Sequence, residues 1–164
     1  MSLDASFERA KALCEELRPR LTAIETEQDA RLQIINRFFT ESLGWDFANI
    51  KTEPHTDSGF TDYLLSVDAQ RRLVIEAKRN GSLLIDTLSP EMKVYRVGGP
   101  ALVSAIPGIK QAANYCLDHG VNYAILTTGV VWIAFIPMPG ASVSFKEGLA
   151  YVFPNFEAIL VFAP

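Results

Sequence analysis

The sequence predicts an α/β protein in which a central mixed β-sheet of about four or five strands is flanked by helices on both sides. Three observations predict this class. Helical periodicity occupies most of residues 7–43, two β-rich runs form a hairpin pattern within residues 60–78, and a further helix precedes two strands within residues 108–136. Strands and amphipathic helices that alternate in this way can bury their apolar faces against one another.

The N-terminal region predicts two helices. Residues 7–24 carry an apolar stripe at helical spacing, and Pro19 is expected to bend or restart that helix. Thr26, with Asp29 three residues later, is typical of a helix start, and the apolar pattern that follows continues to Leu43. Gly44 is expected to end this second helix.

The hairpin pattern consists of Phe60 to Val67 and Arg72 to Lys78, joined by the polar residues 68–71. Side chains alternate along a strand, so Glu76 and Lys78 are expected on the same face. With a turn centred near residues 69 and 70, Asp62 is expected roughly opposite Lys78 and diagonal to Glu76. Two carboxylates and one amine are therefore predicted to converge.

The second half of the chain predicts one helix and three strands, after a region without a predicted element. Residues 80–107 contain glycines and prolines that interrupt every local pattern, and no element is predicted there. A helix is expected from Gly108 to His119, ending at Gly120, and strands are expected at residues 122–127, 130–136 and 150–153.

Composition predicts one globular domain. The chain has 164 residues, of which 49% are hydrophobic and 21% charged, enough apolar material for a core. We divide residues 1–164 into an N-terminal helix (1–25), a core (26–137) and a C-terminal extension (138–164), whose apolar end suggests a fragment of a longer protein. No run of about 18 apolar residues and no export signal is visible, which predicts a cytoplasmic protein without membrane association. Cys14 and Cys116 form no metal-binding or disulfide pattern.

Phosphodiester hydrolysis needs carboxylates that hold a divalent metal. It also needs a nearby cation that acts on the attacking water or on the charge that develops in the transition state. Asp62, Glu76 and Lys78 have this chemistry. The simpler interpretation is a cross-strand salt bridge on a solvated sheet face. The apolar neighbours of these residues disfavour it, because buried charges are costly unless they are paired or bind a metal.

Several motifs, taken in order, resemble the PD-(D/E)XK nucleases, and more narrowly the N-terminal nuclease domain of type I restriction-enzyme motor subunits and predicted type IV restriction endonucleases. The resemblance covers roughly residues 27–135. The sequence departs from the family motif at Thr61, which occupies the position of the proline before the first acid. The motifs are Thr26-Glu27 with Arg31, Leu43-Gly44-Trp45-Asp46, Glu53, Gly59 with Asp62-Tyr63, Ile75-Glu76-Ala77-Lys78, Gln111 with Tyr115, and Leu126-Thr127-Thr128-Gly129 with Trp132.

The resemblance implies a restriction-endonuclease-like fold and a metal-dependent endonuclease that acts on DNA. It assigns Asp62, Glu76 and the backbone carbonyl of Ala77 to the metal, and it gives Lys78 a role at the attacking water. It also implies that the helix residues Gln111 and Tyr115 support the site or touch the DNA backbone, with an ordinary half-buried helix stripe as the alternative.

Glu27 is a further candidate metal ligand, directly or through a water, with a helix N-terminal acid that favours the dipole as its alternative. An oxygen-only ligand set predicts Mg²⁺ or Mn²⁺.

The net charge of −4 is unfavourable for a nuclease, because affinity for the DNA backbone comes largely from Lys and Arg. We therefore expect further domains or subunits to supply DNA affinity and specificity to a restriction or defence module. Two rivals remain. One is a catalytically silent nuclease-fold module for nucleic-acid binding or regulation, and the other is a structural domain whose acid pairs are salt bridges.

Overall fold

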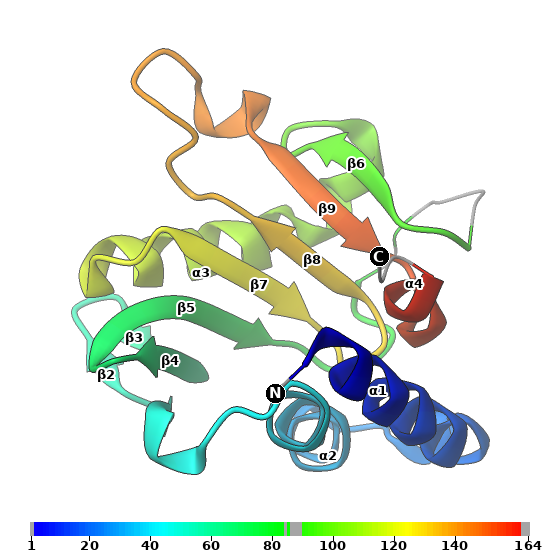
Figure 1. Cartoon of the computed structure of the whole chain (residues 1–164). Helices are drawn as coiled ribbons and strands as arrows, with labels where there is room; N and C mark the ends of the chain where they lie inside the picture. The colour runs from blue at the N-terminus through cyan, green and yellow to red at the C-terminus, as the bar shows by residue number, and fades with distance from the viewer. Residues whose placement is uncertain (1, 84, 86–89, 162–164) are drawn as a thin grey trace.

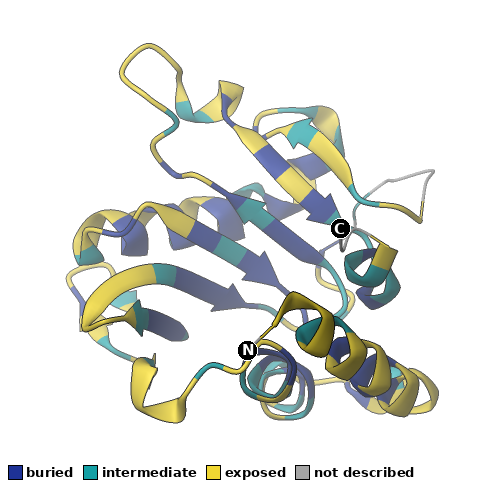
Figure 2. Ribbon diagram, viewed as in Figure 1, coloured by how far each residue is buried: buried dark blue, intermediate teal, exposed yellow. Residues whose placement is uncertain are grey.

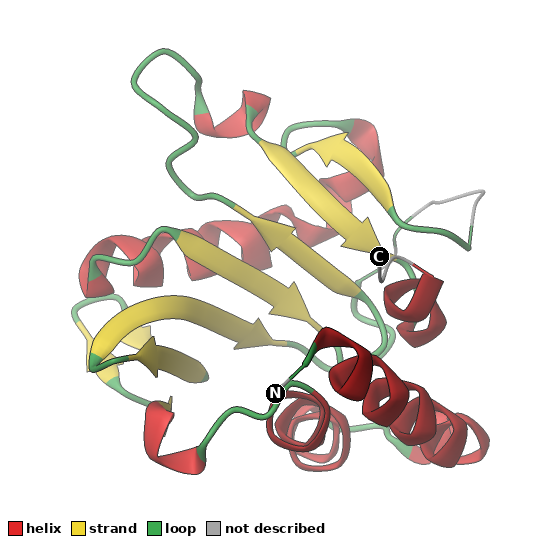
Figure 3. Ribbon diagram, in the orientation of Figure 1, coloured by secondary structure: helices red, strands yellow, loops and turns green. Residues whose placement is uncertain are grey.

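The computed structural model describes residues 2–83, 85 and 90–161, and it contains a seven-stranded mixed sheet with helices against both faces (Figures 1 and 3). The strand order is β1-β4-β5-β7-β8-β9-β6, and β5 and β7 form the one parallel pair among these strands. The strands are β1 (Ile50–Thr52), β4 (Tyr63–Val67), β5 (Gln70–Ala77), β6 (Lys93–Arg96), β7 (Tyr123–Thr127), β8 (Trp132–Phe135) and β9 (Leu149–Phe153), and a separate ribbon pairs β2 (His55–Thr56) with β3 (Gly59–Phe60). The predicted mixed α/β class is confirmed, but the prediction of four or five strands was too low.

The helices begin and end near the predicted positions. The first is α1 (Leu3–Leu17), and a 3-10 segment, Arg18–Ala23, follows it with Pro19 at its start. The next predicted helix is α3 (Ile106–His119), which Gly120 ends with a left-handed φ of 67°, and α4 (Phe156–Val161) was not predicted. The predicted strand near residues 150–153 is β9. Residues 162–164, the end of the predicted C-terminal extension, lie outside the described part of the chain.

The second predicted helix is present but irregular. It starts as α2 (Glu27–Ala30) and continues through two π-helical segments, Arg31–Ile35 and Phe38–Ser42. The side chain of Thr26 accepts a hydrogen bond from the backbone N–H of Asp29 at 3.0 Å, as the predicted helix start requires. Widened π-helical turns are frequent at functional sites.

We expect Thr26→Ala to lower the free energy of unfolding by about 1 kcal/mol, because the N–H of Asp29 loses its capping partner. Urea denaturation checks this, and Thr26→Ser, which keeps the hydroxyl, should remain within a few tenths of a kcal/mol of the wild type. An unchanged stability of Thr26→Ala would show that the cap contributes nothing.

The core has two parts because strand side chains alternate between the two faces of the sheet. On one face, Val74 and Leu126 lie in a buried cluster with Ile109 of α3, and α3 runs behind the sheet in Figure 1. On the other face, Ile75 and Trp132 pack with α1, α4 and the helix that starts at α2. The predicted alternation along β5 therefore places Glu76 on the α3 side of the sheet.

The hairpin is real, but its predicted register is wrong. A two-residue turn at Asp68 and Ala69 joins Val67 to Gln70, and both turn residues have positive φ. A register shift between Leu65 and Ser66 moves the ladder back by one residue, so that Tyr63 pairs with Ile75. Continued by one residue, this register places Asp62 beside Glu76, not opposite Lys78.

Residues 80–107, where no element was predicted, contribute β6 and a 3-10 segment, Pro100–Ala105. β6 forms an edge of the sheet and pairs antiparallel with β9. Residues 84 and 86–89 of this region lie outside the described part. No helix in the described ranges is long and apolar enough to cross a membrane.

The helices leave part of one sheet face uncovered. Figure 2 shows exposed residues along β7 and β9. An apolar hollow of about 740 Å³ lies there, and Tyr123, Ile125, Leu149 and Tyr151 are among the residues that line it. This hollow is on the face opposite to α3 and is therefore separate from the predicted site.

Candidate functional site

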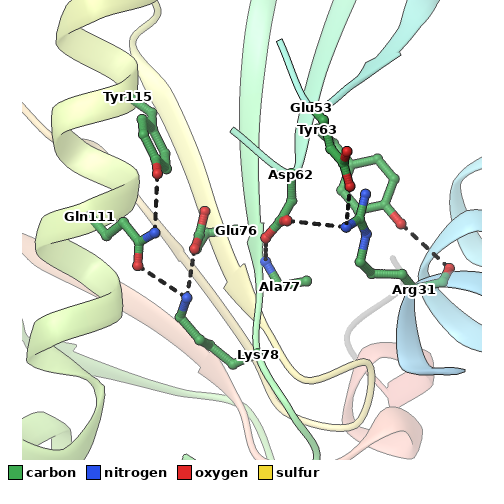
Figure 4. A network of polar contacts seen from close by, with 9 residues as sticks. All are labelled: Arg31, Glu53, Asp62, Tyr63, Glu76, Ala77, Lys78, Gln111 and Tyr115. Atoms are coloured by element: carbon green, nitrogen blue, oxygen red, sulfur yellow. Dashed lines mark hydrogen bonds and ion pairs between the residues drawn. The ribbon is translucent and has the colours of Figure 1, made fainter. Parts of the chain in front are cut away.

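The predicted site residues meet between the end of the β4–β5 hairpin and helix α3 (Figure 4). Asp62 immediately precedes β4, Glu76 lies near the end of β5, and Lys78 directly follows that strand. Gln111 and Tyr115 lie one helical turn apart on α3, and their side chains point toward Lys78. Three segments that are distant in the sequence thus contribute to one polar network.

The Asp62 carboxylate is held from two sides. Its Oδ2 accepts a hydrogen bond of 2.7 Å from the backbone N–H of Ala77, and its Oδ1 lies 3.4 Å from Nη1 of Arg31. The side chain is only 15% exposed. Burial raises the pKa of Asp62, while the Ala77 hydrogen bond and the positive charges of Arg31 and Lys78 act in the opposite direction.

Glu76 is the most deeply buried acid of the site, with 3% of its side chain exposed. Its Oε1 lies 2.6 Å from Nζ of Lys78, whereas its Oε2 is buried and has no hydrogen-bond partner among the described residues. Burial, followed by repulsion from Asp62, raises the pKa of Glu76 to about 7. A buried carboxylate oxygen without a partner is costly and is a reason to look for a bound cation.

Lys78 is positioned by a chain of hydrogen bonds. Its Nζ contacts Glu76 and also donates to Oε1 of Gln111 at 3.0 Å. The amide nitrogen of Gln111 in turn donates to the hydroxyl of Tyr115 at 3.1 Å. Tyr115 is buried, so this chain fixes Gln111, and Gln111 fixes the ammonium group beside Glu76.

The loop before Asp62 is attached to the C-terminal half of α3. The backbone N–H of Ser58 donates to Asp118 at 3.3 Å, and the hydroxyl of Thr61 lies 3.0 Å from Nε2 of His119. A Cβ atom at Gly59 would come within 3.2 Å of the Tyr115 hydroxyl, so the absence of a side chain allows the close approach. These contacts determine where the chain places Asp62.

The other two predicted metal-site residues have different positions. Glu27 begins α2, and burial together with the charge of Asp62 raises its pKa. No hydrogen bond or ion pair joins Glu27 to Asp62 or Glu76 in the described ranges, so its link to the site is electrostatic. Ala77 contributes its backbone N–H to Asp62, and its carbonyl stays a predicted ligand.

Three residues of the network were not predicted as site residues: Arg31, Glu53 and Tyr63 (Figure 4). The Arg31 guanidinium contacts Glu53 at 3.0 Å as well as Asp62, and it lies 5.2 Å from the centre of the Tyr63 ring. Arg31 is four residues after Glu27, on the same helix face, and this spacing is the sequence signal that could have identified it.

The donor atoms suit a divalent cation, although they are not arranged around one. No group of three or more His, Cys, Asp or Glu side chains is positioned to hold a metal ion within residues 2–83, 85 and 90–161. Asp62 forms an ion pair with Arg31 and accepts a hydrogen bond from the Ala77 N–H, and one oxygen of Glu76 accepts a hydrogen bond from Lys78. The unpartnered Glu76 oxygen and the mutual repulsion of the acids nevertheless fit an ion such as Mg²⁺.

The sequence has three basic clusters, and two of them, Arg71 with Arg72 and Lys93 with Arg96, lie far from this site, whereas the third, Lys78 with Arg79, begins at it. Arg71 and Arg72 lie at the start of β5, about 20 Å from its other end at ~3.3 Å per residue. Lys93 and Arg96 lie on β6, four strand positions from β5, which corresponds to about 19 Å. A polyanion at the site would therefore meet little positive charge from these two clusters.

Comparison of the chain with protein-family models, with curated proteins and with solved structures finds no match in any of the three.

Proposed function

We propose that this chain is a metal-dependent DNA endonuclease of the PD-(D/E)XK type. The observation that carries the proposal is the buried Glu76 carboxylate, one oxygen of which has no partner in the described structure while the other contacts Lys78. Asp62 lies beside it, burial raises the pKa values of both acids, and the charge of Asp62 raises the pKa of Glu76 further. Phosphodiester hydrolysis explains such a cluster of acids next to a fixed ammonium group better than a structural salt bridge does.

Asp62, Glu76, the Ala77 carbonyl and Glu27 are the groups that would hold Mg²⁺ or Mn²⁺. When bound, the ion supplies Lewis-acid activation of the phosphate and lowers the pKa of a coordinated water. The chain itself supplies Lys78, whose ammonium group is fixed between Glu76 and Gln111. It would orient the attacking water and stabilise the negative charge that develops on the phosphate oxygens.

The architecture is compatible with a restriction-endonuclease-like core. The antiparallel β4–β5 hairpin, the parallel β5–β7 pair and α3 behind them bring the acids, the lysine and the glutamine to one end of β5. The scattered basic clusters and the net charge of −4 support a module that depends on other domains or subunits for DNA affinity, as in a restriction or defence system.

Supercoiled plasmid provides the direct test. With Mg²⁺ or Mn²⁺, we expect the wild-type protein to nick or linearise the plasmid, whereas Asp62→Asn and a reaction with chelator should leave it intact. Equal cleavage by the wild type and Asp62→Asn would contradict the proposed site. The Asn side chain is similar in size, so thermal unfolding can verify that the variant is folded.

A catalytically silent nuclease-fold module is the second candidate, and one observation favours it: both oxygens of Asp62 already have partners in the chain. Calorimetric titration with Mn²⁺ separates the two candidates. The endonuclease requires saturable metal binding that Asp62→Ala removes, whereas the silent module predicts no binding that depends on Asp62.

A further inference from the structure

The guanidinium group of Arg31 is shared between two carboxylates. Its Nη1 lies 3.0 Å from Oε1 of Glu53 and 3.4 Å from Oδ1 of Asp62. The Arg31 side chain is only 11% exposed, and it lies over the Tyr63 ring, whose hydroxyl donates to the Arg31 carbonyl oxygen at 3.5 Å. Arg31 is thus held next to the metal-site acid by packing as well as by charge.

The two carboxylates differ in their surroundings. The Asp62 side chain is 15% exposed and belongs to the predicted metal site, whereas the Glu53 side chain is 62% exposed. Glu53 also has a φ of 53°, which costs a residue other than glycine roughly 1 kcal/mol or more. Its backbone N–H donates to the Asp62 carbonyl at 3.2 Å, so the strained residue is fixed beside Asp62 with its carboxylate at Arg31.

A divalent ion at Asp62 would compete directly with Arg31. A divalent ion bound to Asp62 and the Arg31 guanidinium would lie within a few ångströms of each other, and the repulsion between them would be strong at a site this poorly solvated. Glu53 offers Arg31 a second partner within reach, so Arg31 need not lose all its ion pairing when it leaves Asp62.

We propose that Arg31 is an internal counter-cation that occupies Asp62 in the metal-free protein and withdraws to Glu53 alone when a divalent metal binds. The inference rests on the proposed function, because the metal is the one that the endonuclease would use. Glu53 acts here as a positioning residue that promotes metal binding without being a ligand. Arg31 is the competitor that the metal displaces.

A double-mutant cycle measured by calorimetric titration with Mn²⁺, without DNA, tests the proposal. We expect Arg31→Met to bind Mn²⁺ about fivefold or more tightly than the wild type, the scale of one partly exposed ion pair. Glu53→Gln should bind Mn²⁺ severalfold more weakly, because Arg31 then has only Asp62 as its partner. In the Arg31→Met background, Glu53→Gln should have no further effect.

Two patterns would overturn the proposal. If Glu53→Gln weakens binding equally in both backgrounds, then Glu53 is a ligand or acts through its charge alone. If Arg31→Met does not tighten binding, Arg31 does not compete with the metal. Glu25→Gln, at an exposed carboxylate shortly before the same helix, is the matched control and should leave the affinity unchanged.

The test remains decisive if Arg31→Met does not fold. Arg31→Gln then replaces it in the cycle, because the amide keeps hydrogen-bond donors but has no charge to compete with the metal, and the effect of Glu53→Gln should fall by at least half. Metal binding that Asp62→Ala removes but that shows no Arg31–Glu53 coupling would reject this inference and leave the endonuclease standing. A wild-type protein that binds no metal would reject both.

Discussion

We expect Lys78→Met to lower the rate of plasmid cleavage at saturating Mg²⁺ by at least about a hundredfold, the usual contribution of a group that acts on protons or charge in the transition state. The physical reason is the position of the Lys78 ammonium group, which Glu76 and Gln111 fix at 2.6 and 3.0 Å. Methionine keeps most of the side-chain volume and removes only the charge and the hydrogen bonds. Plasmid cleavage followed over time measures the rate.

The same variant should still bind metal. Lys78 is a cation next to Glu76, so its removal is expected to leave the Mn²⁺ affinity unchanged or to increase it. Lys93→Met is the matched control, because Lys93 is exposed on β6 at the opposite edge of the sheet, and it should cleave DNA like the wild type. Cleavage by Lys78→Met at the wild-type rate would remove Lys78 from the mechanism.

The second large effect concerns stability in the absence of metal. The pKa of Glu76 is about 7 in the folded protein, against 4.5 for an unperturbed glutamate. Between these values the folded state holds a proton that the unfolded state has lost, so the free energy of unfolding falls as the pH rises from about 4.5 to about 7. At about 1.4 kcal/mol per pH unit, the loss from this one group reaches the order of 3 kcal/mol.

Glu76→Gln should remove this loss. With chelator at pH 8, we expect the variant to be more stable than the wild type by up to about 3 kcal/mol, because the amide has no charge to desolvate. Asp62 and Glu27 shift in the same direction as Glu76, and His119, whose pKa burial lowers, acts in the opposite direction. The difference between wild type and variant across the pH range therefore isolates Glu76.

Urea denaturation at pH 5 and pH 8 provides the measurement. Glu8→Gln, at an exposed position on α1, should follow the wild-type pH dependence and serves as the control. A difference in stability between Glu76→Gln and the wild type that is the same at pH 5 and pH 8 would contradict the burial argument. Saturating Mg²⁺ should stabilise the wild type at pH 8 but stabilise Glu76→Gln much less.

The sequence predicts those parts of the fold that depend on local chemistry. The Thr26 cap, the helix end at Gly120 and the alternation of apolar side chains along β5 follow from neighbouring residues, and all three are present. The class of fold follows from them. The same local reasoning identifies Asp62, Glu76 and Lys78 as neighbours, because a hairpin connects their strands.

The parts that were missed depend on distant residues. β6 is strand-like only because β9 pairs with it, more than 50 residues later in the chain. The hairpin register is a local exception: the turn lies one residue earlier than predicted and a register shift follows at Leu65 and Ser66, and composition reveals neither. Arg31 reaches Asp62 only because the helix that carries it packs against the sheet, and the four-residue spacing from Glu27 indicates a shared helix face but not this contact.

The single parallel strand pair among the described strands has a consequence for the order in which this site can form during folding. The Asp62–Ala77 contact closes a loop of only 15 residues, whereas the Arg31–Glu53 contact spans 22 and the Lys78–Gln111 contact spans 33. Chain entropy favours short loops, so the hairpin can bring Asp62 and Glu76 together, with Lys78 already two residues from Glu76, before β7 docks on β5 and before Arg31 arrives. A newly made hairpin would then carry the Asp62 carboxylate without its counter-charge, and neutralising it would be part of the driving force that draws the helix with Arg31 into place.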